Sequence, residues 1–174
     1  MKFTHTLLLA SGLVLTSVVG TPALAQAATG ANLEGVFTDW TVYSRSEGGD
    51  KICYVLAKPS TKTPTSVRHG DIYFMVANWK SGVAQEQPSL LTGYPLKAEV
   101  PPSARIDRNK IPMFAADNEA FIESETDEKK LVQSMRKGAR MRVDAMSKRG
   151  TQTSYEFSLK GVTAALKKAK AVCQ

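Results

Sequence analysis

A strict alternation of apolar and polar residues marks two segments in the C-terminal third of the chain. In residues 139–145 and 153–159 every second side chain is apolar, apart from Thr153, and the side chains between them are charged or hydroxylated. Successive side chains of a strand point to opposite faces of a sheet. Both segments therefore predict strands with one buried face and one solvated face. A polar and basic link at 147–151 joins them.

Shorter apolar runs predict further strands earlier in the chain. Residues 40–43 and 52–57 lie on either side of a turn-rich segment that contains Gly48-Gly49, which is typical of a hairpin. Residues 72–79 are apolar on both faces and hold three aromatic rings, so they predict a central strand. Other short strands are expected at 89–96, at 104–107 and 111–114 around an Arg108–Lys110 turn, and at 119–123.

Two segments have a helical period instead. One helix is expected to begin at Thr126 or Asp127, with acidic residues in its first turn, and to end at Gly138. The other covers residues 162–172, with lysines on its wet side. Several short strands at a spacing of 8–15 residues, with only two helices, predict a mainly β fold: an antiparallel β-sandwich with two peripheral helices. Residues 36–174 are expected to form this single domain.

The N-terminal residues have the pattern of a secretory signal peptide. Lys2 supplies a positive start, residues 7–20 form an apolar run, and Ala23-Leu24-Ala25 has the small-x-small pattern of a cleavage site. We expect a signal peptide at 1–25 with cleavage before Gln26, or slightly later. The apolar run is shorter than the roughly 20 residues that a membrane span requires. The mature protein is therefore expected to be exported and not membrane-spanning, with a disordered N-terminus at 26–35.

The chain contains two cysteines, Cys53 and Cys173. In an oxidising compartment two thiols most simply form a disulfide, which would join the last helix to an early strand. The alternative is a pair of free redox thiols, although the chain lacks a Cys-x-x-Cys spacing.

A net charge of +7 favours anionic partners such as lipopolysaccharide, acidic lipid headgroups or nucleic acid. Arg140 and Arg142 share the wet face of their predicted strand, and Arg149 lies in the following link. These three arginines are the candidate site for an anionic partner, and the alternative is an ordinary charged sheet face. Nucleic acid is not expected, because the basic group lacks interleaved aromatic residues for stacking.

Catalytic and metal chemistry find little support. His69 could act as a base or metal ligand, but zinc requires three or four convergent ligands, so a solvated hydrogen-bonding histidine is the favoured interpretation. The acidic residues of segment 117–125 lack the glycine turn of a calcium loop. We therefore expect no catalytic residue, no metal and no cofactor.

Several segments together resemble the invasion-associated locus B (IalB) family. They include Cys53-Tyr54, residues 68–76, 93–97, 131–138, 147–151 and 158–166. The resemblance implies an exported bacterial protein, periplasmic or envelope-associated, with an immunoglobulin-like β-sandwich. The periplasm is the expected location, and outer-membrane association and secretion are the alternatives. The expected function is a binding or accessory role toward an envelope protein or an anionic envelope component. The alternative is a periplasmic hydrolase that acts on cell-wall material.

Overall fold

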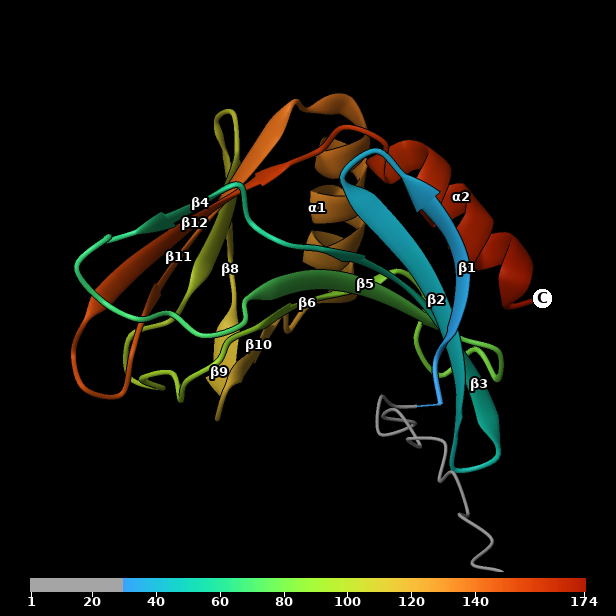
Figure 1. Ribbon diagram of the computed structural model, residues 1–174, viewed down its shortest axis with the longest axis horizontal. Coiled ribbons are helices and arrows are strands. Elements are labelled where there is room, and N and C mark those ends of the chain that lie inside the picture. Colours follow the sequence, from blue (N-terminus) through green and yellow to red (C-terminus); the bar gives the residue numbers. More distant parts are fainter. Residues whose placement is uncertain (1–29) are drawn as a thin grey trace, which may run out of the picture.

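Two antiparallel sheets form the body of the protein. The structure is a computed structural model that describes residues 30–174. A seven-stranded sheet has the order β1-β2-β3-β5-β6-β10-β9, and a five-stranded sheet has the order β4-β12-β11-β7-β8. The two sheets diverge from a shared core, and both helices lie on one side of the seven-stranded sheet (Figure 1). This arrangement confirms the predicted β-sandwich with two helices. The predicted signal peptide lies outside the described residues.

The elements have the following bounds: β1 Asn32–Phe37, β2 Trp40–Glu47, β3 Asp50–Ala57, β4 Thr61–Thr63, β5 Tyr73–Trp79, β6 Gln87–Leu91, β7 Ser103–Ile106, β8 Asn109–Pro112, β9 Phe114–Ala116, β10 Glu119–Phe121, α1 Glu125–Lys137, β11 Arg140–Met146, β12 Gln152–Ser158 and α2 Val162–Val172. The expected hairpin of β2 and β3 turns at Gly48 and Gly49, which both have positive φ, as the tight turns of hairpins require.

The prediction of a disordered N-terminus to residue 35 is wrong from Asn32 onward, because β1 begins there and pairs with β2. Leu33 and Val36 of this strand are exposed. Backbone pairing therefore holds β1 in place, together with a hydrogen bond from Ser44 Oγ to Glu34 Oε1 of 2.6 Å. An edge strand held in this way leaves little apolar pattern in the sequence. The remainder of the predicted segment, residues 26–29, lies outside the described residues.

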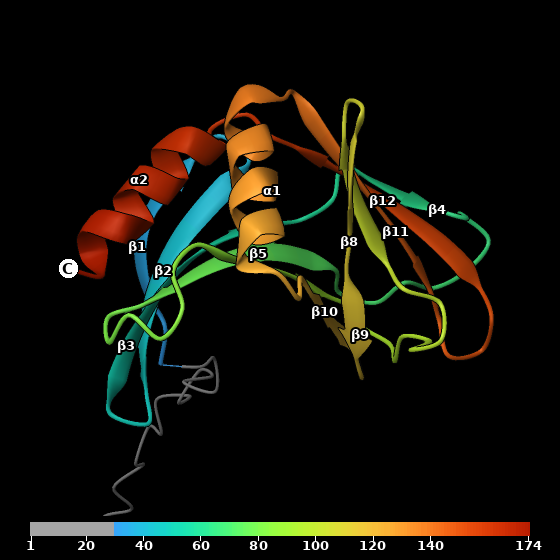
Figure 2. The ribbon, with the colours of Figure 1, turned by 180° about the vertical axis from the view of Figure 1, so that it is seen from behind.

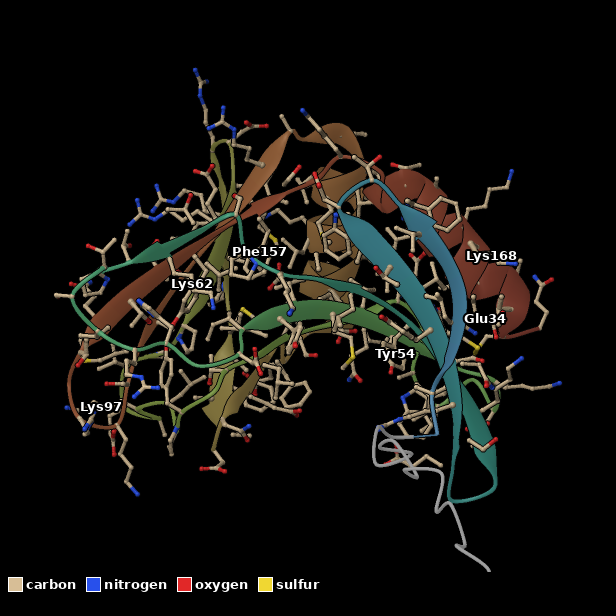
Figure 3. The ribbon with its side chains drawn as sticks, viewed as in Figure 1. Glu34, Tyr54, Lys62, Lys97, Phe157 and Lys168 are labelled. Atoms are coloured by element: carbon tan, nitrogen blue, oxygen red, sulfur yellow. A yellow bond between two sulfur atoms is a disulfide. The ribbon has the colours of Figure 1, made fainter. Side chains whose placement is uncertain are left out.

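The core lies between the sheets and combines many aliphatic side chains with a few large aromatic ones. Trp40, Phe74 and Phe157 are fully buried, and the rings of Phe74 and Phe157 meet edge to face with centroids 5.6 Å apart. Figure 3 shows Phe157 in the space between the two sheets. Trp40 also joins the sheets directly, because its indole Nε1 donates a hydrogen bond of 3.0 Å to the Ser158 carbonyl.

Figure 2 shows both helices beside the sheets, and both bury side chains in this core. Helix α1 is capped by Ser124, which accepts from the Asp127 N–H, so it begins two to three residues before the predicted cap. The helix buries Leu131, Val132 and Met135. Helix α2 packs across β1, β2 and β3. Within residues 30–174 no helix is long and apolar enough to cross a membrane.

The Cys53–Cys173 disulfide fixes the end of α2 to β3, with the two Cα atoms 5.6 Å apart. This is the pairing that the sequence favoured. The opposite face of the seven-stranded sheet carries no helix, and Tyr54 lies on that face, stacked on Tyr43 (Figure 3).

Candidate functional site

The three arginines predicted to form one site lie in two places. Arg140 and Arg142 project from the face of β11 that is turned away from the core. The residues that alternate with them, Met141 and Val143, are fully buried on the other face. Arg149 lies in the turn at the far end of the β11–β12 hairpin. At about 3.3 Å per residue, the five positions from Arg142 to the start of that turn span roughly 16 Å. The three arginines therefore do not lie side by side.

Strand pairing places two other basic residues beside Arg142. Arg142 is the register partner of Arg105 on β7, and Arg105 is the register partner of Lys110 on β8. All three side chains are exposed on the same outer face of the five-stranded sheet. We call Lys110, Arg105 and Arg142 the basic row. Cross-strand neighbours of this kind have Cβ atoms about 4.5–5.5 Å apart.

Carboxylates offset only part of this charge. Arg142 Nε donates to Asp144 Oδ1 at 2.7 Å, and Arg140 Nη1 donates to Glu156 Oε1 at 3.3 Å. Among the residues that the structure describes, Arg105 and Lys110 form no ion pair. Positive charge is therefore in excess over β7 and β8.

A hollow of about 490 Å³ adjoins the basic row on the outer face of this sheet. Lys110 and Arg142 line it, together with the hydroxyl-bearing residues Thr63, Ser103 and Ser154. Guanidinium, ammonium and hydroxyl donors are the groups that proteins use to bind phosphate and carboxylate oxygens. The surface therefore has the donors that an anionic ligand requires.

His69 is buried, contrary to the expectation of a solvated side chain. Its exposed fraction is 8%, and its Nδ1 and Nε2 lie 3.0 Å from the Tyr155 hydroxyl and 2.9 Å from the Pro64 carbonyl oxygen. A carbonyl can only accept, so Nε2 carries a proton and donates to Pro64. Both ring nitrogens are therefore engaged within the protein. Tyr155 lies 86 residues away in the sequence, which explains why a local pattern did not reveal this contact.

The Tyr155 hydroxyl continues into a short polar network. It lies 2.5 Å from the Tyr94 hydroxyl, which in turn lies 2.8 Å from Thr153 Oγ1. Burial and the hydrogen bond with Tyr94 raise the pKa of Tyr155 above the ordinary tyrosine value, so this phenol stays neutral. Within residues 30–174, no group of three or more His, Cys, Asp or Glu side chains is arranged to hold a metal ion.

Comparisons with known proteins agree with this architecture. The family model described as "Invasion associated locus B (IalB) protein" matches residues 40–170. The crystal structure of invasion associated protein B from Bartonella henselae superposes with a TM-score of 0.54 at 12% sequence identity. The match covers 79% of this chain and 95% of that chain, and at this identity it shows a shared fold. No curated protein matches the sequence. Since the family model covers most of the chain, the protein belongs to the invasion associated locus B family.

Proposed function

We propose that this protein is an exported, non-catalytic binding protein of the bacterial cell envelope that docks an anionic envelope component on its basic row. The observation that carries the proposal is the alignment of three like charges on neighbouring strands. Opposite charges on neighbouring strands stabilise a sheet by about 0.2–1 kcal/mol per pair, whereas like charges directly opposite each other destabilise it. A bound anion would remove that repulsion, so the row is better suited to a ligand than to the fold.

Export is supported by two independent features of the chain. Residues 1–25 have the pattern of a signal peptide. The Cys53–Cys173 disulfide is a bond that persists in oxidising compartments such as the bacterial periplasm. We place the protein on the periplasmic side of the envelope on these grounds.

A binding role is favoured over hydrolysis by the position of His69. A general base must reach the proton that it removes. Both nitrogens of this imidazole are instead hydrogen-bonded to Tyr155 and Pro64, and the ring is buried. Its hydrogen bonds tie the segment before β5 to strand β12, which is a structural role.

The surroundings of the basic row favour a phosphorylated lipid or glycolipid over nucleic acid. Positions beside the row on the same sheet face carry Ser103, Asp144, Ser154 and Glu156, and none of them offers an aromatic ring on which a base could stack. Arginine can bind phosphate through two parallel N–H donors, and hydroxyls suit the sugar of a glycolipid. Lipopolysaccharide, which combines phosphates and sugars, fits these donors.

The test compares binding to vesicles with and without lipopolysaccharide. One variant combines Arg105→Gln, Lys110→Gln and Arg142→Gln. A matched control combines Lys130→Gln, Lys167→Gln and Lys170→Gln, which removes the same charge from the helices. Binding is measured at ionic strengths near 0.01 M and 0.15 M, where the Debye length is roughly 30 Å and 8 Å.

The basic-row variant is expected to bind about tenfold more weakly than wild type at low salt, a change of about 1.4 kcal/mol. The control is expected to bind like wild type. Equal losses in both variants would mean that only net charge matters, and wild-type binding by the basic-row variant would reject this surface as the site.

A further inference from the structure

A second cavity, of about 380 Å³, lies where the two sheets are joined, away from the basic row. Three chain segments line it: residues 67–69 before β5, residues 93–95 after β6, and residues 147–153 in the β11–β12 turn and the start of β12. Its size falls within the range of about 300–1,000 Å³ that is usual for small-molecule sites.

Backbone contacts hold these three segments together. The Lys148 N–H donates to the Pro95 carbonyl at 2.9 Å, and Leu96 forms an isolated bridge with Ser147. Residues 69–71 approach the second segment closely, because a Cβ on Gly93 would lie only 2.9 Å from the Asp71 nitrogen. The cavity walls are therefore fixed by the fold and do not depend on flexible side chains alone.

The floor of the cavity is built from the buried polar network. His69, Tyr94 and Thr153 all line it, and Tyr155 joins them through its hydroxyl. Each polar atom in this network has a partner within the protein. The hydrogen-bonded floor is therefore rigid, and the partly exposed ring of Tyr94 is available for apolar contact.

The rim has a different chemistry. Arg68, Lys148 and Arg149 line the cavity and are exposed, whereas the residues that line it include no carboxylate. Among residues 30–174 none of these three cations forms an ion pair. Val67 and Pro95 add apolar surface below them, and Val67 is 38% exposed.

We propose that this cavity binds a small amphiphilic carboxylate, that is, an organic anion with an apolar body. The carboxylate head lies against Arg68, Lys148 and Arg149, where it supplies the negative charge that the rim lacks. The apolar body lies against Val67, Pro95 and the Tyr94 ring. An arginine fork binds a carboxylate through two parallel hydrogen bonds, which would fix the orientation of the ligand.

Calorimetric titrations of the full mature protein with three probes distinguish the contribution of the carboxylate head to binding from that of the apolar body. Octanoate has both parts, acetate has only the head, and 1-octanol has only the body with a neutral end. Octanoate is expected to bind at least about tenfold more tightly than either of the others, since it alone makes both sets of contacts. Equal binding of octanoate and octanol would overturn the proposed anion rim, and absence of octanoate binding would overturn the site.

Variants locate the binding site. Arg68→Gln combined with Arg149→Gln is expected to weaken octanoate binding about tenfold and to leave octanol unchanged. Both side chains are exposed, so the fold should tolerate the change. The basic-row variant described above serves as the control and is expected to bind octanoate like wild type. Loss of octanoate binding in that control, or its retention in the Arg68/Arg149 variant, would contradict this assignment. The two proposals therefore succeed or fail separately.

Discussion

Removal of the disulfide should cost a large part of the stability of this protein. Cys53 and Cys173 are 120 positions apart, so the bond closes most of the domain into one loop. The chain-entropy relation, −2.1 − 1.5R ln n with n equal to 120, gives a loss of about 16 cal/mol/K in the unfolded chain. At 25 °C this corresponds to about 4.9 kcal/mol, against a typical total stability of about 5–15 kcal/mol.

The folded state itself should change little when the bond is absent. Val162, Ala165, Leu166 and Ala169 of α2 stay buried against the sheet whether or not the bond is present. The double variant Cys53→Ala/Cys173→Ala should therefore keep the native spectrum and lose about 4–5 kcal/mol of unfolding free energy.

Urea denaturation followed by tryptophan fluorescence measures this loss, with and without reductant. Reduced wild type should match the double variant, because both lack the same loop closure, and reductant should not affect the double variant. A loss below about 1 kcal/mol would refute the reasoning, since the unfolded chain would then gain almost no freedom from opening the loop.

Three further predictions concern single side chains. Arg105→Gln should raise the unfolding free energy at low salt, because it relieves cross-strand repulsion, and the gain should be no larger than the roughly 0.2–1 kcal/mol of a favourable cross-strand pair. A lower unfolding free energy in urea denaturation would contradict the repulsion. Burial raises the pKa of Tyr155 in the folded protein. The resulting stabilisation is fully present below about pH 10, the pKa of an unfolded tyrosine, and it is lost as the pH rises further, because the unfolded phenol then ionises and the folded one does not. Urea denaturation between about pH 8 and 11 should show this loss of unfolding free energy in wild type and not in Tyr155→Phe. An identical dependence of the unfolding free energy on pH in both proteins would disprove it. Gly161→Ala should lower the melting temperature of the protein far more than Gly150→Ala. The two glycines have nearly equal φ angles, +89° and +88°, so the backbone strain is the same. A Cβ on Gly161 would lie 2.0 Å from the Phe37 carbonyl oxygen, whereas a Cβ on Gly150 would meet nothing within 4 Å. Similar melting temperatures would mean that the chain relaxes around the contact.

Side-chain alternation predicted the strands whose inner face is buried. Strands β11 and β12 follow this pattern closely, because buried and more exposed positions alternate along both of them. Strands β1 and β4 escaped prediction because pairing with β2 and β12 holds them, and none of their own side chains is buried. A pattern of burial cannot mark a strand that buries little.

The candidate site was only partly predictable for a similar reason. The face of Arg142 follows from its place in an alternating strand, but its neighbour Arg105 comes from the pairing of β11 with β7, which the local sequence does not encode. The expected turn at 108–110 also placed Lys110 in a loop. The structure has it in β8, because the chain turns at Asp107, which has a positive φ, and Arg108.

Mapping of the bound surface by NMR tests the central claim most directly. A ¹⁵N-labelled sample is titrated with lipopolysaccharide micelles, and the backbone amides whose signals shift first are recorded. The proposed function predicts that these amides lie in β7, β8 and β11, around Arg105, Lys110 and Arg142. First shifts confined to the lysine-bearing face of α2 or to the helix-free face of the seven-stranded sheet would contradict it.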